Sequence, residues 1–329
     1  MAKLYLFNPE CDIARGAALD SYTPPANIRA MRKKLSLTPA AYADRDSAIL
    51  LSDDMDEDEL RTLPYYDIVS AKNISIINPS RLNIFLRHNE CVPVPWGWER
   101  SVANYLIRKG VDNRFIPTAG QLARLRMEAS RIKTIDFFTK YGGCFPGITS
   151  PVCFDSTEKA IEFWHDDNDI WFKSPWSSSG RGNLLASEMK KDILRPWISG
   201  VIKNQRYVIA EKNYHKTLDF ASLWMLDGGK AKFLGFSVFE ADSRGRYHGN
   251  IIGSQSYLKS LIFDKCKWND DILEMQKEFL ESSEHMTIDG PVGFDMLVTS
   301  DGNINPCVEI NRRYTMGIVA LYESEFRKI

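Results

Sequence analysis

Three polar side chains near the C-terminal end of the chain have the types and spacing of a magnesium site. Asp295 lies in the first of two short apolar runs, Glu309 and Asn311 lie in the second, and Asp301-Gly302 between them is a strong hairpin signal. Side chains alternate along a strand, so Glu309 and Asn311 share one face. Carboxylate and amide oxygens are ligands that Mg²⁺ prefers, with phosphates and waters completing its octahedron. The alternative is an ordinary hairpin whose acids face solvent.

A second stretch upstream has a composition suited to phosphate binding. Residues 170–173 are predicted to form a strand that ends at Lys173 and runs into a Ser/Gly-rich loop. Such a loop can cradle phosphate with its backbone N–H groups while the ammonium supplies charge. It is not a Walker A loop, because no Gly-Lys-Ser/Thr opens a helix. A flexible linker is the alternative interpretation. The candidate loop residues are Ser177, Ser178, Ser179 and Gly180.

Taken in this order and spacing, the two stretches resemble the ATP-grasp superfamily over about residues 121–329. The ending Glu309-Ile-Asn311-Arg-Arg313 is the most specific element of the resemblance. It implies that ATP is covered on one side by the lysine strand and its loop. On the other side, Asp295, Glu309 and Asn311 would hold Mg²⁺, as two ions in the usual family arrangement.

The resemblance implies further contacts to the nucleotide. Arg131 takes the position where the family commonly has a phosphate-binding lysine, and Lys133 close by is the other candidate. Glu211 matches the glutamate that reads the exocyclic amine of adenine, and Tyr214 lies where backbone contact is expected. Asp219 matches the acid at the start of the next strand, where it would touch ribose or a metal.

Three arginines are candidates for the chemistry itself. Arg313 would stabilise the charge that develops on the transferred group or tetrahedral centre. Arg244 and Arg246 lie in a glycine-punctuated loop after a strand predicted at 231–239, where they would clamp a carboxylate or acyl phosphate. An exposed hairpin tip is the alternative for this loop.

The activity implied by the resemblance is that of an ATP- and Mg²⁺-dependent ligase. A carboxylate of a small molecule or peptide would take the γ-phosphoryl group, and an amine or thiol would then displace phosphate. Three alternatives stay open: an ATP-grasp kinase that phosphorylates a small molecule and stops, a non-catalytic nucleotide-binding module, and a metal-independent sugar- or peptide-binding protein.

Composition excludes several other classes. The 42 Lys+Arg residues balance 43 Asp+Glu residues, which gives no electrostatic case for a nucleic acid or membrane partner. No apolar run approaches the ~18 residues of a membrane span, and the first residues lack the apolar length of a signal peptide. The six cysteines contain no Cys-x-x-Cys pair, so zinc and a disulfide framework are not expected. We therefore expect a cytoplasmic protein, and a homodimer is compatible with the sequence.

The elements that must position these residues indicate an α/β protein. Alternating strands and helices in residues 1–118 predict a Rossmann-like domain with a small parallel sheet, and the resemblance implies an ATP-grasp lid at 119–208 and a metal- and nucleotide-binding α+β part at 209–329. The sequence also predicts one helix over 127–141 and a rigid loop over 93–98. Glu10 and Asp12 follow the first strand, where they would meet an amine substrate or lie solvated in a turn.

Overall fold

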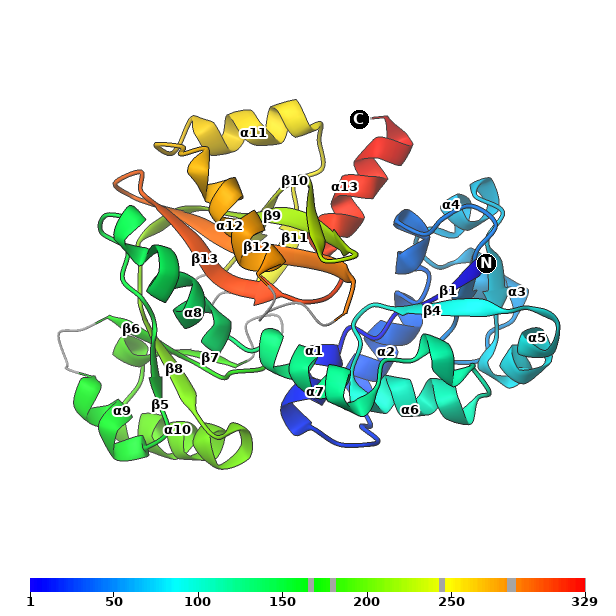
Figure 1. Ribbon diagram of the computed structural model, residues 1–329, viewed down its shortest axis with the longest axis horizontal. Helices are drawn as coiled ribbons and strands as arrows, with labels where there is room; N and C mark the ends of the chain where they lie inside the picture. The colour runs from blue at the N-terminus through cyan, green and yellow to red at the C-terminus, as the bar shows by residue number, and fades with distance from the viewer. Residues whose placement is uncertain (165–168, 178–181, 243–245, 283–287, 329) are drawn as a thin grey trace.

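Three sheets organise the chain in the computed structural model (Figure 1). They occupy residues 2–95, 152–212 and 216–311. The α/β class is thereby confirmed, and the division at 118 and 208 stays a prediction. The structure describes residues 1–164, 169–177, 182–242, 246–282 and 288–328.

The N-terminal sheet is parallel, as its alternating strands and helices predict. Its order is β3 (Ser75–Ile77), β2 (Ala48–Leu50), β1 (Ala2–Leu6) and β4 (Cys91–Pro95). β1 and β2 are short apolar runs because both faces of this sheet are covered. The helices of this region are α1 (Cys11–Ala17), α2 (Ala26–Lys34), α3 (Glu57–Arg61), α4 (Tyr66–Ala71), α5 (Leu82–His88) and α6 (Arg100–Arg108).

The predicted loop at residues 93–98 is wrong in its first half, which belongs to strand β4. Pro93 and Pro95 pair with Leu4 and Leu6 of β1. Proline lacks the N–H that a strand shared by two neighbours needs, but β4 is the edge of the sheet and has one neighbour. The prolines therefore mark an edge strand here.

The second sheet is antiparallel and carries the lysine strand. Its order is β5 (Val152–Phe154), β8 (Val208–Lys212), β6 (Ile170–Lys173) and β7 (Asn183–Leu185). Helices α9 (Thr157–Phe163) and α10 (Lys191–Gln205) lie together on one side of it (Figure 1). Phe172, Leu194, Ile198 and Val208 are fully buried between the sheet and these helices.

The third sheet carries the metal-site motif. Its antiparallel order is β11 (Tyr247–Asn250), β10 (Lys230–Ala241), β9 (Lys216–Asp227), β12 (Gly290–Thr299) and β13 (Ile304–Asn311). The predicted hairpin is confirmed, and Gly302 at its turn has φ +79°, a conformation that favours glycine. Helices α11 (Gln255–Phe263), α12 (Asp271–Glu281) and α13 (Met316–Arg327) complete this part of the chain.

The helix predicted over 127–141 is two helices, α7 (Ala119–Glu128) and α8 (Ile132–Tyr141). Between them the backbone N–H of Arg131 donates to the carbonyl of Pro175, 3.0 Å away, and the Ser130 hydroxyl accepts from the N–H of Ile132 at 3.3 Å. The apolar periodicity continues through this break, so the sequence pattern could not reveal that the helix is interrupted. The break turns Arg131 out of the helix and into the centre of the molecule.

Two expected absences can be compared with the structure. In the described ranges no helix combines the length and the apolar character needed to cross a membrane. All six cysteines are free, so the expected lack of a disulfide framework is consistent with the coordinates.

Candidate active site

A cavity of about 650 Å³ lies where the three sheets meet. Its size is that of a pocket for a small molecule or nucleotide, ~300–1,000 Å³. Strands β6, β8, β9, β10, β12 and β13 all contribute side chains to its wall. The predicted site residues that line it are Arg131, Lys173, Glu211, Tyr214, Asp219, Asp295, Glu309, Asn311 and Arg313.

Asp295 and Glu309 face each other across the β12–β13 hairpin. They are direct partners in the strand register, and Asn311 lies opposite Gly293, one step along the same face. Burial, with the charge of Glu309 next in size, raises the pKa of Asp295 to about 7. Asn311 and Arg313 act in the other direction, but they do not cancel the effect. Two carboxylates are therefore held together without enough positive charge to keep both ionised.

This donor set fits a magnesium ion that shares its ligands with phosphate. A divalent cation bound by Asp295 and Glu309 would lower the pKa of Asp295, because its charge would offset the effects of burial and of the Glu309 charge. Within the described ranges no group of three or more His, Cys, Asp or Glu side chains is placed to hold a metal. The protein offers two carboxylates and one amide, so nucleotide oxygens and water would supply the remaining ligands, as Mg²⁺ usually requires.

Arg131 connects the loop after Lys173 to strand β13. It is 4% exposed, and its Nη1 donates to the Ser174 carbonyl at 2.7 Å and to Ser177 Oγ at 2.6 Å. Its Nη2 donates to Glu309 Oε2 at 2.8 Å. Its Nε is buried without a hydrogen-bond partner in the described structure. Arg131 is thus fixed at the centre of the cavity with donor capacity left over.

Lys173 and Glu211 form a buried ion pair between β6 and β8. Lys173 Nζ donates to Glu211 Oε1 at 2.8 Å, and each residue is only 6% exposed. Each group is the other's partner inside the protein, and removing one of them would leave an unpaired polar group buried. The pair leaves two ammonium hydrogens and Glu211 Oε2 free for a phosphate and an amine, respectively.

The other nucleotide-end candidates are fixed by local hydrogen bonds. The Tyr214 hydroxyl accepts from the N–H of Thr149 at 2.8 Å, which leaves the backbone of Tyr214 at the cavity wall. Asp219 accepts from Lys216 at 2.5 Å, while burial raises the pKa of Asp219. Both residues line the cavity, so their positions are compatible with base and ribose contacts.

The structure does not bring every candidate to the cavity. Arg246 is exposed and not part of the cavity wall; its backbone exchanges hydrogen bonds with Asp242. Its role as a clamp stays a prediction, and the exposed hairpin tip describes its observed position. Ser178, Ser179, Gly180 and Arg244 lie outside the described residues.

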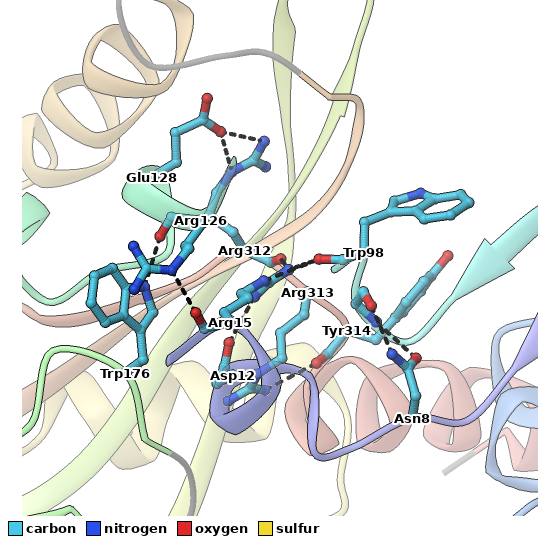
Figure 2. A network of polar contacts seen from close by, with 11 residues as sticks. Asn8, Asp12, Arg15, Trp98, Arg126, Glu128, Trp176, Arg312, Arg313 and Tyr314 are labelled. Atoms are coloured by element: carbon cyan, nitrogen blue, oxygen red, sulfur yellow. Dashed lines mark hydrogen bonds and ion pairs between the residues drawn. The ribbon is translucent and has the colours of Figure 1, made fainter. Parts of the chain in front are cut away.

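Arg313 is held in place by the N-terminal part of the chain, as Figure 2 shows. Its Nε donates to Asp12 Oδ2, and its Nη1 donates to the Tyr314 carbonyl at 3.1 Å. Arg15 binds the other oxygen of Asp12 at 2.7 Å and the Arg312 carbonyl at 2.9 Å. Burial tends to raise the pKa of Asp12, but Arg313 and Arg15 outweigh it and hold that pKa below its ordinary value.

Sequence reasoning considered Asp12 as an amine contact or a solvated acid, but it missed Arg15 and the pairing of Asp12 with Arg313. Of the two alternatives given for Asp12, the solvated turn is wrong, because residues 11–17 form α1 and Asp12 is 5% exposed. Asp12 follows β1 at the carboxyl end of a parallel sheet, where ligand sites usually lie. That position was the available signal, but nothing local could reveal a partner near residue 313.

The adjacent Arg312 has a different environment. Its guanidinium donates to Glu128 Oε2 at 3.1 and 3.2 Å and to the Ile288 carbonyl at 2.8 Å. Arg312 is 6% exposed and does not line the cavity. Both arginines follow the end of β13 at Asn311. Arg312 packs inside the protein against Glu128, and Arg313 reaches the cavity.

The loop after Lys173 is connected to the same network through Trp176. The Arg126 guanidinium lies 3.7 Å from the centre of the Trp176 ring, and Trp176 Nε1 donates to the Arg126 carbonyl at 2.7 Å. Arg126 Nε donates to the Arg15 carbonyl at 2.5 Å (Figure 2). The loop after Lys173 is therefore anchored to α1, the helix that holds Arg313.

Comparisons with known proteins place this geometry in a wider context. No protein-family model matches the sequence, and no curated protein matches it either. A biotin carboxylase from Campylobacter jejuni, solved as a β-γ-ATP complex, is 14% identical with a TM-score of 0.52, and the match covers 98% of this chain and 71% of that chain. An N5-carboxyaminoimidazole synthetase from Staphylococcus aureus, complexed with ADP, is 14% identical with a TM-score of 0.50, and covers 95% and 71%. At these identities the likeness concerns the fold.

Proposed function

The chain has the ATP-grasp fold, and we propose that it uses this fold as an ATP- and Mg²⁺-dependent ligase that joins a carboxylate to an amine through an acyl phosphate. The observation that carries the proposal is the pairing of Asp295 with Glu309 in one cavity with Arg131 and Lys173. The carboxylates, which would bind a divalent cation, and the two basic side chains, which would bind an anion, face the same cavity. Magnesium nucleotide satisfies both demands at once.

The proposed nucleotide site uses residues from two sheets. Lys173 and Arg131 would bind the phosphates, and Glu211 Oε2 would accept from the exocyclic amine of adenine. Asp295, Glu309 and Asn311 would hold magnesium, as two ions. The ions would neutralise charge on the phosphoryl oxygens. Supporting this assignment, all six residues line one cavity.

The proposed reaction has two displacements. A carboxylate oxygen of the first substrate attacks the γ-phosphorus, the bond to the β–γ bridging oxygen breaks, and ADP leaves with that electron pair. The amine of the second substrate then attacks the carbonyl carbon of the acyl phosphate, and inorganic phosphate leaves as the nitrogen loses a proton. Arg313, with donors facing the cavity, would stabilise the charge on the transferred group.

The test begins with binding. Magnesium together with ATP or ADP should raise the melting temperature by several degrees, whereas nucleotide with chelator should give little shift. ADP release should then require a carboxylate, and the coupled product should require an amine as well. Phosphorylated product that forms from a hydroxyl compound without amine would point to a kinase instead. Thermal scans without any magnesium-dependent nucleotide shift would remove the basis of the proposal.

A further inference from the structure

The cavity continues beyond Arg313 into a part that the nucleotide does not explain. Its wall there is made by Phe7, Met31, Leu35, Trp96, Phe239 and Met316, which we call the apolar compartment. Five of them belong to one hydrophobic cluster that joins the N-terminal sheet, β10 and α13; Met31, at the mouth, is 36% exposed. Phe7 and Trp96 meet edge to face with ring centres 4.9 Å apart. The compartment is thus a preformed surface of rings and thioethers.

The polar side chains beside this compartment mostly satisfy one another. Asn250 Nδ2 donates to Ser237 Oγ at 2.6 Å, and the Tyr247 hydroxyl donates to Asn250 Oδ1 at 2.5 Å. Thr315 Oγ1 caps α13 by accepting from the N–H of Ile318 at 3.3 Å. These groups therefore offer little to a charged ligand.

Arg313 is the exception at the border of the compartment. Its Nε and Nη1 have partners, but within the described residues its Nη2 has no hydrogen bond. The guanidinium side chain is 14% exposed, toward the cavity it lines. Of the acids in the cavity wall, Glu211, Asp219, Asp295 and Glu309 all lie on the nucleotide side, and the described wall of the apolar compartment has none.

We propose that the carboxylate substrate is a monocarboxylic acid with an uncharged apolar body, aromatic or branched aliphatic. Its carboxylate binds Arg313 Nη2 next to the magnesium site, and its body fills the apolar compartment. An added ammonium would lack a counterion there, and a second carboxylate would lack a donor. Burying either charge unpaired is costly. This assignment rests on the proposed function and adds the substrate class to it.

The experiment compares three acids of similar length on the full chain with magnesium ATP. They are 3-phenylpropionate, phenylalanine, which adds an ammonium group, and glutarate, which replaces the ring with a second carboxylate. Hydroxylamine serves as the amine, so the acyl phosphate is read out as hydroxamate together with ADP. We expect kcat/KM for 3-phenylpropionate to exceed both others at least tenfold.

A matched pair of variants locates the preference. Met31→Glu places a carboxylate at the mouth of the compartment and should lower kcat/KM for 3-phenylpropionate about tenfold, with the magnesium nucleotide melting shift unchanged. Ile84→Glu on α5 introduces the same charge at a residue that is 61% exposed and outside the cavity wall, and should change neither quantity.

The outcomes separate this inference from the proposed function. A preference for glutarate or phenylalanine, or equal effects of the two variants, overturns the apolar assignment and leaves the ligase intact. Hydroxamate from none of the three acids, despite a magnesium nucleotide shift, also overturns the apolar assignment. Loss of both the shift and all ADP release overturns the two proposals together.

Discussion

The two ends of the cavity differ in how they are built. The proposed nucleotide end is dense in charge and comes from the second sheet and the β12–β13 hairpin. Asp295, Glu309 and Asn311 lie within a stretch of seventeen residues there. The apolar compartment is assembled from residues scattered between Phe7 and Met316, and among the described residues Arg313 is its one available cation. In the proposed function, the magnesium ligands come from one short stretch of the chain. The residues that would select the carboxylate substrate come from distant segments that pack together.

The largest effect should come from neutralising the metal strands at the nucleotide end. Asp295→Asn keeps the shape of the side chain but removes the charge that would ligate magnesium, so we expect turnover to fall about 10³-fold. Glu309→Gln retains an acceptor for Arg131 and should be partly rescued by added magnesium. Steady-state ADP release over a magnesium titration measures both. Near-normal turnover in Asp295→Asn would mean that the charged end does not carry the chemistry.

A smaller effect is expected at the border between the two ends. Arg313→Ala should lower kcat/KM for the carboxylate by roughly 10²–10³-fold while nucleotide affinity stays within a few-fold. Arg313→Lys should not recover the loss, because an ammonium cannot reproduce a bidentate fork. Asp12→Asn, which loosens the guanidinium, should have an intermediate effect. Turnover and nucleotide affinity are measured on the same preparations.

Arg312 provides the matched control for this prediction. Its pairing with Glu128 is buried and lies away from the cavity, so Arg312→Leu should lower the melting temperature and leave the chemistry of the folded fraction unchanged. If Arg313→Ala instead lowered stability and nucleotide affinity together, Arg313 would be a structural residue like its neighbour.

A pH effect of about tenfold should distinguish the acidic end from the apolar end. The raised pKa of Asp295, about 7, means that protons compete with magnesium below that pH. The magnesium concentration for half-maximal nucleotide shift should therefore rise as pH falls from 8 to 6, and stay level above pH 8. Glu309→Gln removes the neighbouring charge and should move this dependence to lower pH. A flat profile in the wild type contradicts the assignment of Asp295 as a ligand.

The smallest predicted effect concerns adenine. If Glu211 Oε2 accepts from the exocyclic amine of adenine, Glu211→Gln should weaken ATP binding roughly fivefold, which is the contribution of about one hydrogen bond. The preference for ATP over GTP should become smaller. Lys173 keeps an oxygen acceptor in this variant, so the phosphate side is preserved. Wild-type protein that binds ATP and GTP equally would leave Glu211 without this role.

Much of the nucleotide end could be predicted from the sequence because its geometry follows from strand periodicity. A spacing of two places Glu309 and Asn311 on one face, and the Asp301-Gly302 turn brings Asp295 opposite Glu309. The acids that line the cavity were found in this way or through the family resemblance. The parallel N-terminal sheet followed from alternation of strands and helices.

The remaining features depend on contacts that no local pattern records. Asp12 shows its role only when Arg313 is beside it, and the break before Arg131 depends on Pro175 accepting a backbone hydrogen bond. The apolar compartment uses ordinary core residue types, so Phe7 and Leu35 look like packing in the sequence. Pro93 is tolerated in β4 because β4 is the edge strand, and that position depends on the whole N-terminal sheet.

The double pairing of Asp12 has a consequence for the order in which the chain acquires its structure. Arg15 lies three residues away within α1, so the N-terminal sheet can form with its buried carboxylate already neutralised. Arg313 is separated from Asp12 by 301 positions, and during synthesis it emerges after the N-terminal domain has had time to fold. Asp12, the acceptor for Arg313, is then in place before Arg313 is synthesised. Replacing Arg15 should therefore reduce the yield of correctly folded protein more than it reduces the turnover of the folded molecules.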